Sequence, residues 1–142
     1  MPITVTAPRG ELTPEGEAQI LPRLTTALVN ASGAEGNQFF TSIVGGTVHL
    51  LEPKDIYGGG EPRPIVMVEL KLPDIGLNSE DTRAAFIEAA TQIVDELTVS
   101  GHSSNDTWIN ILNAPSGGWG IGGVSFTAER IVSAAQPPAV SV

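Results

Sequence analysis

The chain repeats one unit twice, and this repeat constrains its fold more than any other feature of the sequence. The first copy opens with a strand-like run, Pro2 to Ala7. After a turn, Thr13 can cap a helix and Pro14 suits its first position, so a helix is predicted to begin there. Apolar side chains then recur at spacings of three, four and three residues, which predicts one buried helical face: Leu21, Leu24, Leu28 and Ala31.

The first copy is predicted to end with a second strand. Gly33 stops the helix, and the segment from Phe39 to Leu51 is rich in β-branched and aromatic residues. The pair Gly45-Gly46 interrupts that strand. Residues 2–51 are therefore predicted to form a first β-α-β unit.

After a turn-rich linker at residues 52–63, the same order of elements returns. A strand is predicted from Pro64 to Leu72, and Ser79 with two acidic residues behind it suits a helix N-terminus. Trp108 to Leu112 is predicted to be the last strand of the unit. The second helix repeats the spacing of the first before Gly101 ends it, with Ile87, Ala90, Val94 and Leu97 on its buried face.

Two tandem β-α-β units predict a single α/β domain, a two-layer sandwich with a four-stranded sheet. Right-handed crossovers would place both helices on one face of the sheet. Residues 64–123 would form the second unit and a hairpin, and residues 124–142 a C-terminal strand and tail, with no helix expected at 133–142. The opposite sheet face is expected to be apolar and bare, so packing favours a homo-oligomer.

The composition of the chain argues against several classes of function. The formal charge of −9 argues against nucleic-acid binding, which needs a basic surface. No apolar run reaches the ~18 residues of a membrane span and no signal peptide precedes Pro2, so we expect a cytoplasmic protein. Cysteine is absent, which excludes disulfides and thiolate chemistry. His49 and His102 lie far apart without other metal ligands, so no metal or cofactor is expected.

Pro2 is the first candidate for chemistry, because it follows Met1 directly. Methionine before so small a residue is usually trimmed, which would leave a secondary amine at the N-terminus. An α-amino group titrates near ~8, and desolvation or a nearby cation lowers its pKa toward the ~7 that suits a general base. If Met1 is retained, this nitrogen is an amide and cannot act as a base. Pro2 would then only begin an edge strand.

The segment 113–123 is the second candidate. It places Trp119 in a run of glycine and small residues directly after a predicted strand. Glycine permits positive φ and close backbone approach, so a tight β-hairpin or bulged loop is predicted. Beside an N-terminal amine, this loop would form the wall of an apolar pocket. The alternative is a structural turn in which Trp119 covers the core.

Taken together, these features resemble the tautomerase superfamily, the relatives of 4-oxalocrotonate tautomerase that have an amino-terminal proline. The resemblance covers most of the chain: Pro2-Ile3, the doubled unit, and the hairpin sequence Trp119-Gly120-Ile121-Gly122-Gly123. It implies a trimer, as in the branches of macrophage migration inhibitory factor, malonate semialdehyde decarboxylase and cis-3-chloroacrylic acid dehalogenase. In this family the free proline nitrogen moves a proton between carbon and oxygen, or activates water or a carbonyl.

The resemblance also implies roles for individual residues. Pro2 would be the general base, and Asn110 would donate a hydrogen bond to the enolate oxygen. Arg9 would bind a substrate carboxylate with its guanidinium fork and lower the pKa of the proline, although it could equally be a solvated turn residue. Arg63 is a weaker candidate for the same task, and Lys71 is weaker again. The residues expected to bind substrate are thus Arg9, Arg63, Trp108 and Trp119.

Three departures from the family pattern bear on the reaction. Trp108 stands where 4-oxalocrotonate tautomerase has an arginine, and Leu28 where the dehalogenase has a histidine. Leu72 and Pro73 follow Lys71, so the arginine pair of the dehalogenase and the decarboxylase is absent. Keto-enol tautomerisation of a small 2-oxo or 2-hydroxydienoate acid is therefore favoured. The alternatives are a non-catalytic oligomeric protein, which the negative charge favours, and a hydratase or lyase.

Overall fold

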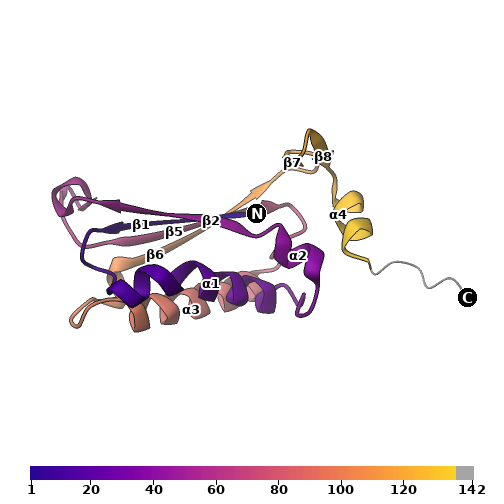
Figure 1. Cartoon of the computed structure of the whole chain (residues 1–142). Helices are drawn as coiled ribbons and strands as arrows, with labels where there is room; N and C mark the ends of the chain where they lie inside the picture. Colours follow the sequence, from indigo (N-terminus) through magenta and orange to yellow (C-terminus); the bar gives the residue numbers. More distant parts are fainter. Residues whose placement is uncertain (137–142) are drawn as a thin grey trace, which may run out of the picture.

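The computed structural model of the chain describes residues 1–136, and its centre is a four-stranded sheet in the order β2-β1-β5-β6 (Figure 1). β1 (Pro2–Pro8) is parallel to β2 (Gly45–Leu51) and antiparallel to β5 (Val66–Pro73). β5 is in turn parallel to β6 (Thr107–Ala114). Each parallel pair belongs to one β-α-β unit, which confirms the predicted tandem repeat.

Two long helices cover one face of this sheet, as predicted (Figure 1). α1 (Pro14–Ala31) begins where Thr13 Oγ1 accepts a hydrogen bond from the Gly16 amide at 2.9 Å. α3 (Glu80–Leu97) begins at Ser79, which forms a reciprocal capping box with the third residue of the helix. Within residues 1–136, no helix is both long and apolar enough to cross a membrane.

The core lies between the helices and the sheet, and five of the predicted helix positions are buried in it: Leu24, Leu28, Ala90, Val94 and Leu97. Only the first predicted position of each helix differs, by one residue. In α3, Phe86 is fully buried whereas Ile87 is 40% exposed. In α1, Ile20 is fully buried whereas Leu21 is only partly buried. A period of 3.6 residues places positions 20 and 86 near the middle of the buried face and their neighbours at its edge.

The segment before β2 is helical, so the predicted strand from Phe39 is wrong in its first part. α2 (Gln38–Ser42) begins at Asn37, whose Oδ1 accepts a hydrogen bond from the Phe40 amide at 2.9 Å. An asparagine cap stabilises a helical turn, and this local bond outweighs the β propensity of the residues that follow. The strand therefore begins at Gly45 instead of being interrupted there.

The linker between the two units contains a small hairpin at one end of the sheet (Figure 1). A short 3-10 helix, η1 (Pro53–Asp55), leads into β3 (Tyr57–Gly58). β3 pairs with β4 (Glu61–Pro62).

The predicted hairpin after β6 is confirmed. β7 (Trp119–Ile121) pairs antiparallel with β8 (Val124–Phe126) across Gly122-Gly123, whose φ angles of 60° and 81° require glycine.

A fourth helix follows the hairpin, contrary to the prediction that the chain is not helical from residue 133. α4 (Ala128–Ala135) begins at Thr127, whose Oγ1 accepts a hydrogen bond from the Arg130 amide at 3.2 Å. The helix ends before the Pro137-Pro138 pair on which the prediction rested. The rest of the predicted tail, 137–142, lies outside the described residues.

No described helix covers the second face of the sheet (Figure 1). This face was predicted to be apolar, and its composition is instead mixed, because threonine, charged and amide side chains alternate with the core residues along the strands. Strand alternation and register place the following residues on it: Pro2, Thr4, Thr6, Thr47, His49, Met67, Glu69, Lys71, Trp108, Asn110 and Leu112.

Gly16 marks the contact between the start of α1 and the end of α3, and it yields a stability prediction. A Cβ at this position would collide with the carbonyl oxygen of Leu97, which also accepts a hydrogen bond from the Thr13 amide at 3.0 Å. Glycine to alanine inside a helix ordinarily adds up to ~1 kcal/mol of stability. Here we expect Gly16→Ala to lower the free energy of unfolding by ~1–3 kcal/mol, measured by urea denaturation.

The matched control is Glu17→Ala, at the next and exposed position of the same helix. Its free energy of unfolding should stay within ~0.5 kcal/mol of the parent value. A Gly16→Ala variant as stable as the parent would contradict the close contact.

Candidate active site

Pro2 stands at the start of β1 and lines a cavity of about 360 Å³. The neighbouring walls come from Met1, from the segment between Ser42 and Thr47, and from strand β7 of the hairpin. The next residue of β1, Ile3, is completely buried in the core. The first strand thus holds Pro2 at the boundary between the packed interior and an open hollow.

Two packing features bring the walls of this cavity together. A Cβ on Gly46 would lie 2.8 Å from the Ile3 carbonyl oxygen, so glycine permits the close approach of β2 to β1. On the other side, Trp119 packs edge-to-face against Phe126, with ring centroids 5.4 Å apart and an interplanar angle of 61°. Pro2 and Trp119, both predicted to be site residues, therefore line the same cavity.

Met1 is buried although it is the terminal residue, with 4% of its surface exposed. Its amine donates a hydrogen bond to the Ile43 carbonyl at 2.6 Å, and its own carbonyl accepts one from the Gly45 amide at 3.1 Å. Burial lowers the pKa of this amine from its ordinary value of 8.0 to about 6. The amine is thus partly desolvated. While Met1 is attached, the Pro2 nitrogen is an amide without basicity.

Lys71 is the cation that the sheet places beside Pro2. In the antiparallel pair, Ile3 stands opposite Leu70, so the next step of the same register puts Pro2 opposite Lys71. Strand alternation turns both residues toward the open face. The sequence ranked Lys71 last among the candidate cations, because nothing in the sequence states that β1 and β5 are antiparallel neighbours.

Three other predicted residues lie at the opposite end of the strands. Arg9 follows the last residue of the seven-residue strand β1, whose first residue is Pro2, so the two lie roughly 20 Å apart. Its Nε contacts Glu52 Oε1 at 3.1 Å, and both side chains are largely exposed. Arg63 Nε donates to Asp106 Oδ1 at 2.8 Å, and its guanidinium lies 5.7 Å from the ring centre of Trp108.

Asn110 is separated from Pro2 within one chain. It stands on β6 opposite Glu69 of β5, so a whole strand lies between it and β1. The described residues that line the Pro2 cavity include Trp119 but none of the other candidates: Arg9, Arg63, Lys71, Trp108 and Asn110. One chain therefore assembles only part of the predicted site.

A second polar cluster joins the loops at the far end of the sheet. His102 Nδ1 contacts Glu11 Oε1 at 2.7 Å, and its Nε2 contacts Thr107 Oγ1 at 2.9 Å. This order of carboxylate, imidazole and hydroxyl is found in hydrolases, but the His102 side chain is only 1% exposed. Because a substrate cannot reach the imidazole, we assign the cluster a structural role: its hydrogen bonds connect the loop before α1 with the loop after α3. Among residues 1–136 no group of three or more potential metal ligands comes together.

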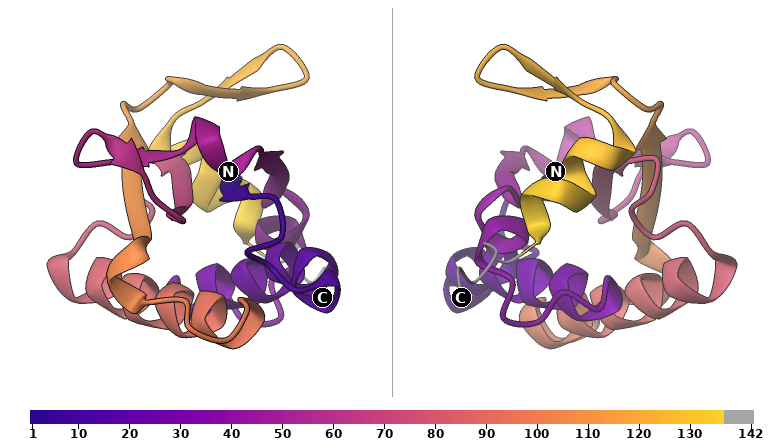
Figure 2. Two further views of the ribbon diagram at one scale, coloured as in Figure 1. Left: turned by 90° about the vertical axis from the view of Figure 1, so that its left-hand side faces the viewer. Right: turned by 90° about the vertical axis from the view of Figure 1, so that its right-hand side faces the viewer.

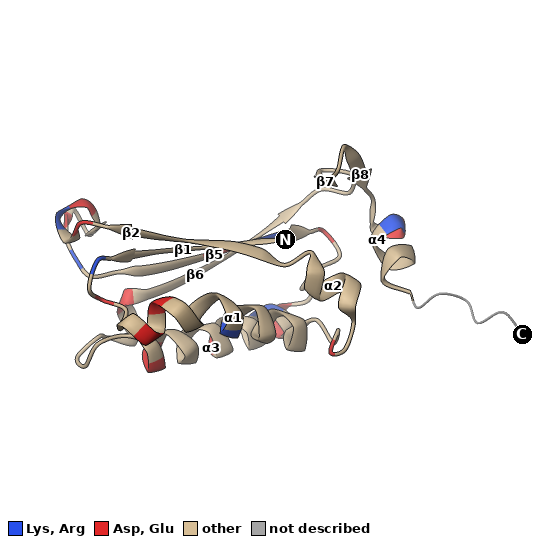
Figure 3. Cartoon of the chain, in the orientation of Figure 1, with Lys and Arg blue, Asp and Glu red and all other residues tan. Residues whose placement is uncertain are grey.

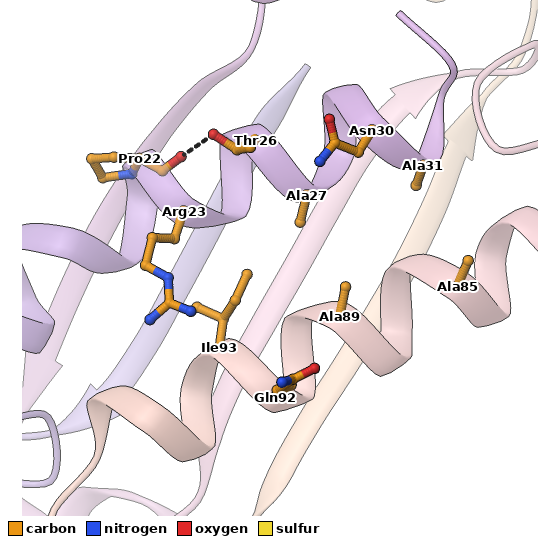
Figure 4. A pocket seen from close by; sticks show the side chains of 10 residues that line it. All are labelled: Pro22, Arg23, Thr26, Ala27, Asn30, Ala31, Ala85, Ala89, Gln92 and Ile93. Atoms are coloured by element: carbon orange, nitrogen blue, oxygen red, sulfur yellow. Dashed lines mark hydrogen bonds between the residues drawn. The ribbon is translucent and has the colours of Figure 1, made fainter. Parts of the chain in front are cut away.

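A further cavity, of about 680 Å³, lies on the outer side of the helix layer between α1 and α3 (Figure 4). Small side chains line it, including Ala27 and Ala89, and Arg23 at its edge is paired with Glu96. It contains no candidate base or nucleophile. Figure 3 shows acidic residues along these helices, whereas the hairpin strands β7 and β8 carry no charge.

No protein-family model matches the chain, and no curated protein matches it in sequence. Solved structures do match in fold. The symmetric trimer of wild-type Q0 fused 4-OT superimposes with a TM-score of 0.74 at 20% identity, covering 92% of this chain and 98% of its own.

Two further structures match as well. Pt0534 inactivated by 2-oxo-3-pentynoate has a TM-score of 0.72 at 22% identity, covering 92% of this chain and 98% of its own. N1, a member of the cis-3-chloroacrylic acid dehalogenase family, has a TM-score of 0.73 at 16% identity, with coverages of 97% and 93%. The chain therefore has the fold of the tautomerase superfamily, in the form that fuses two β-α-β units in one polypeptide.

Proposed function

We propose that the chain, once Met1 is removed, is a cofactor-independent tautomerase that acts on a small 2-oxo or 2-hydroxydienoate acid. The observation that carries this proposal is the place of Pro2 at a cavity walled by the hairpin, at an end of the sheet where burial lowers the pKa of an amine. The fold match supports it. Pt0534, which shares the fold, is inactivated by 2-oxo-3-pentynoate, a 2-oxo acid.

The proposed reaction needs one base and no redox step. The neutral Pro2 nitrogen removes a proton from the carbon next to the substrate carbonyl. The electrons of the broken C–H bond form a C=C bond, and the carbonyl π pair moves to oxygen. The protonated Pro2 then returns its proton to that oxygen, which gives the enol, and the reverse sequence gives the ketone. Trp119 supplies an apolar wall that keeps the nitrogen partly desolvated.

Lys71 is our choice to hold the substrate carboxylate within one chain. Its register position beside Pro2 puts an ammonium at the open side of the same site. A cation near the Pro2 nitrogen also disfavours protonation of that nitrogen. Arg9 and Arg63 lie at the far end of the strands and pair with Glu52 and Asp106, so either could reach a Pro2 site only from a neighbouring subunit.

We further propose that the protein is a homotrimer in which neighbouring subunits complete each site. The Q0 fused 4-OT structure is a symmetric trimer. The open face of the sheet carries Asn110 and Trp108, both exposed in a single chain. Assembly through the sheets would bring these residues of one subunit toward Pro2 of the next.

A non-catalytic protein with this fold is the second candidate. The observation that favours it is the fit of Met1, which is buried and hydrogen-bonded at both its amine and its carbonyl. Intact-mass spectrometry of the protein from its natural host distinguishes the two, since retained Met1 leaves no free proline nitrogen. Proton NMR with 2-oxo and halogenated acids would reveal hydratase or lyase chemistry through irreversible product formation.

Replacing Pro2 tests the base. Pro2→Ala leaves a primary amine in a slightly different position, and we expect kcat/KM for enol ketonisation, followed by ultraviolet absorbance, to fall by about 10²–10⁴-fold. For the parent, kcat/KM should rise with pH through the pKa of Pro2, since only the neutral nitrogen accepts a proton. Thr4→Ala, two residues along the same face, is the control and should retain activity. Unchanged activity of Pro2→Ala would remove the proline from the mechanism.

Replacing Lys71 tests the carboxylate anchor. Lys71→Ala should raise KM about tenfold or more for 2-oxo acids, because one charge-assisted hydrogen bond is lost. Lys71→Arg should keep most of the affinity. The same substitutions should have little effect on the corresponding methyl esters, which carry no charge to bind. Equal losses for acids and esters would show that Lys71 acts on structure and not on the carboxylate.

Subunit mixing tests the trimer and the role of Asn110. Sedimentation should give three times the chain mass, and Asn110→Ala should be impaired on its own. If Asn110 serves a neighbour's Pro2, random co-assembly with Pro2→Ala chains should restore about a quarter of the parent sites. If activity is not recovered, Asn110 does not serve the Pro2 of a neighbouring subunit. A monomeric mass in sedimentation would refute the trimer.

A further inference from the structure

Met1 separates two cavities. One is the hollow of about 360 Å³ at Pro2, and the other is a cavity of about 250 Å³ behind it. Within residues 1–136, Met1 is the one residue that lines both. Its side chain belongs to the buried core cluster and lies where removal of the residue would leave a space between the two.

The second cavity is mostly apolar and is closed by α4. Phe40, Leu77 and Ile131 contribute to its wall. Asn37 Nδ2 donates a hydrogen bond to the Ala135 carbonyl at 2.9 Å, which fixes the end of α4 against the start of α2. The right-hand view of Figure 2 shows α4 across the end of the molecule where the N-terminus lies.

The loop between β5 and α3 forms a rigid part of the same wall. Leu77 adopts φ 47°, which is unusual for a non-glycine residue, and it is nevertheless 4% exposed. Asn113 Nδ2 donates to the carbonyls of Pro73 and Gly76 at 2.9 and 2.8 Å. These hydrogen bonds attach the loop to β6 independently of Met1.

One polar atom in this cavity wall has no partner. Ser32 Oγ is buried and forms no hydrogen bond, although the residue lines the cavity. A buried hydroxyl without a partner costs about 1–3 kcal/mol, so native structures usually satisfy it. Because this hydroxyl forms no hydrogen bond, its replacement breaks none, and Ser32 is therefore a suitable position for variants of the cavity wall.

We propose that Met1 marks the place of the substrate, and that its removal creates the binding site. The Met1 carbonyl oxygen, bonded directly to the Pro2 nitrogen through its carbon, accepts the Gly45 amide at 3.1 Å. After removal, this N–H is free and lies beside the Pro2 nitrogen. A substrate carbonyl oxygen placed near this position, in non-bonded contact with the Pro2 nitrogen, receives the hydrogen bond, and the substrate's aliphatic substituent fills the space left by the methionine side chain.

This arrangement defines a substrate class. The ligand is a 2-oxo acid with an unbranched apolar substituent about as long as a methionine side chain. In the proton transfer, negative charge develops on the carbonyl oxygen, and the Gly45 N–H is aimed at that charge. This catalytic part rests on the proposed function, whereas binding in the cavity does not.

Binding of inert acids tests the cavity apart from catalysis. Hexanoate and acetate share the carboxylate and differ in the aliphatic chain. For the chain that begins at Pro2, calorimetry should show hexanoate binding about tenfold or more tightly than acetate, because the chain buries apolar surface. For a chain released from a fusion so that it begins at Met1, the preference should disappear. The same preference in both forms, or in neither, would overturn the proposal.

Two matched variants locate the binding. Ser32→Leu fills the cavity and should abolish the preference for hexanoate while acetate binding is kept. Ser32→Ala leaves the space and should retain the preference. An unchanged preference in Ser32→Leu would place the ligand elsewhere.

The hydrogen bond is tested by NMR. Addition of 2-oxohexanoate should move the Gly45 amide proton downfield, and hexanoate, which lacks the keto oxygen, should not. Similar shifts with both acids would remove Gly45 from the proposal. Pro2→Ala should keep the preference for hexanoate. An inactive protein that binds hexanoate more tightly would therefore refute the proposed function and leave the cavity assignment standing.

Discussion

The antiparallel contact between β1 and β5 is the interaction on which the rest of the structure depends. It joins two β-α-β units that are each incomplete, because a two-stranded parallel pair with one helix leaves most of its apolar surface in water. The joined sheet lets α1 and α3 bury a common core. The same contact decides the candidate site, since its register places Lys71 opposite Pro2 at one end and leaves Arg9 and Arg63 at the other.

Burial of the N-terminus connects the fold to the proposed chemistry. A terminal residue is ordinarily solvated, yet Met1 is 4% exposed and its amine is partly desolvated. The environment that lowers the pKa of this amine is the one a proline base would need after processing. Removal of Met1 would thus expose a nitrogen, an amide donor at Gly45 and an apolar space in one step.

Most of the fold follows from local signals in the sequence. Thr13 and Ser79 cap the helices where the sequence predicts, and the Gly122-Gly123 turn closes the hairpin. The errors arise where local signals compete. Phe39 and Phe40 favour a strand, but the Asn37 cap stabilises a helical turn at these residues. The α4 helix was missed because the prediction gave weight to the prolines beyond it and not to Thr127, although a threonine before a helix is a recognisable N-cap signal.

The sequence by itself determined the repeated unit, the terminal proline and the glycine-rich hairpin, because periodicity, caps and turns are encoded over a few residues. Tertiary structure alone decided which cation stands beside Pro2, where Met1 lies, and that Asn110 is a strand away. These relations depend on how strands distant in the chain align, and strand register is fixed by packing of the whole core.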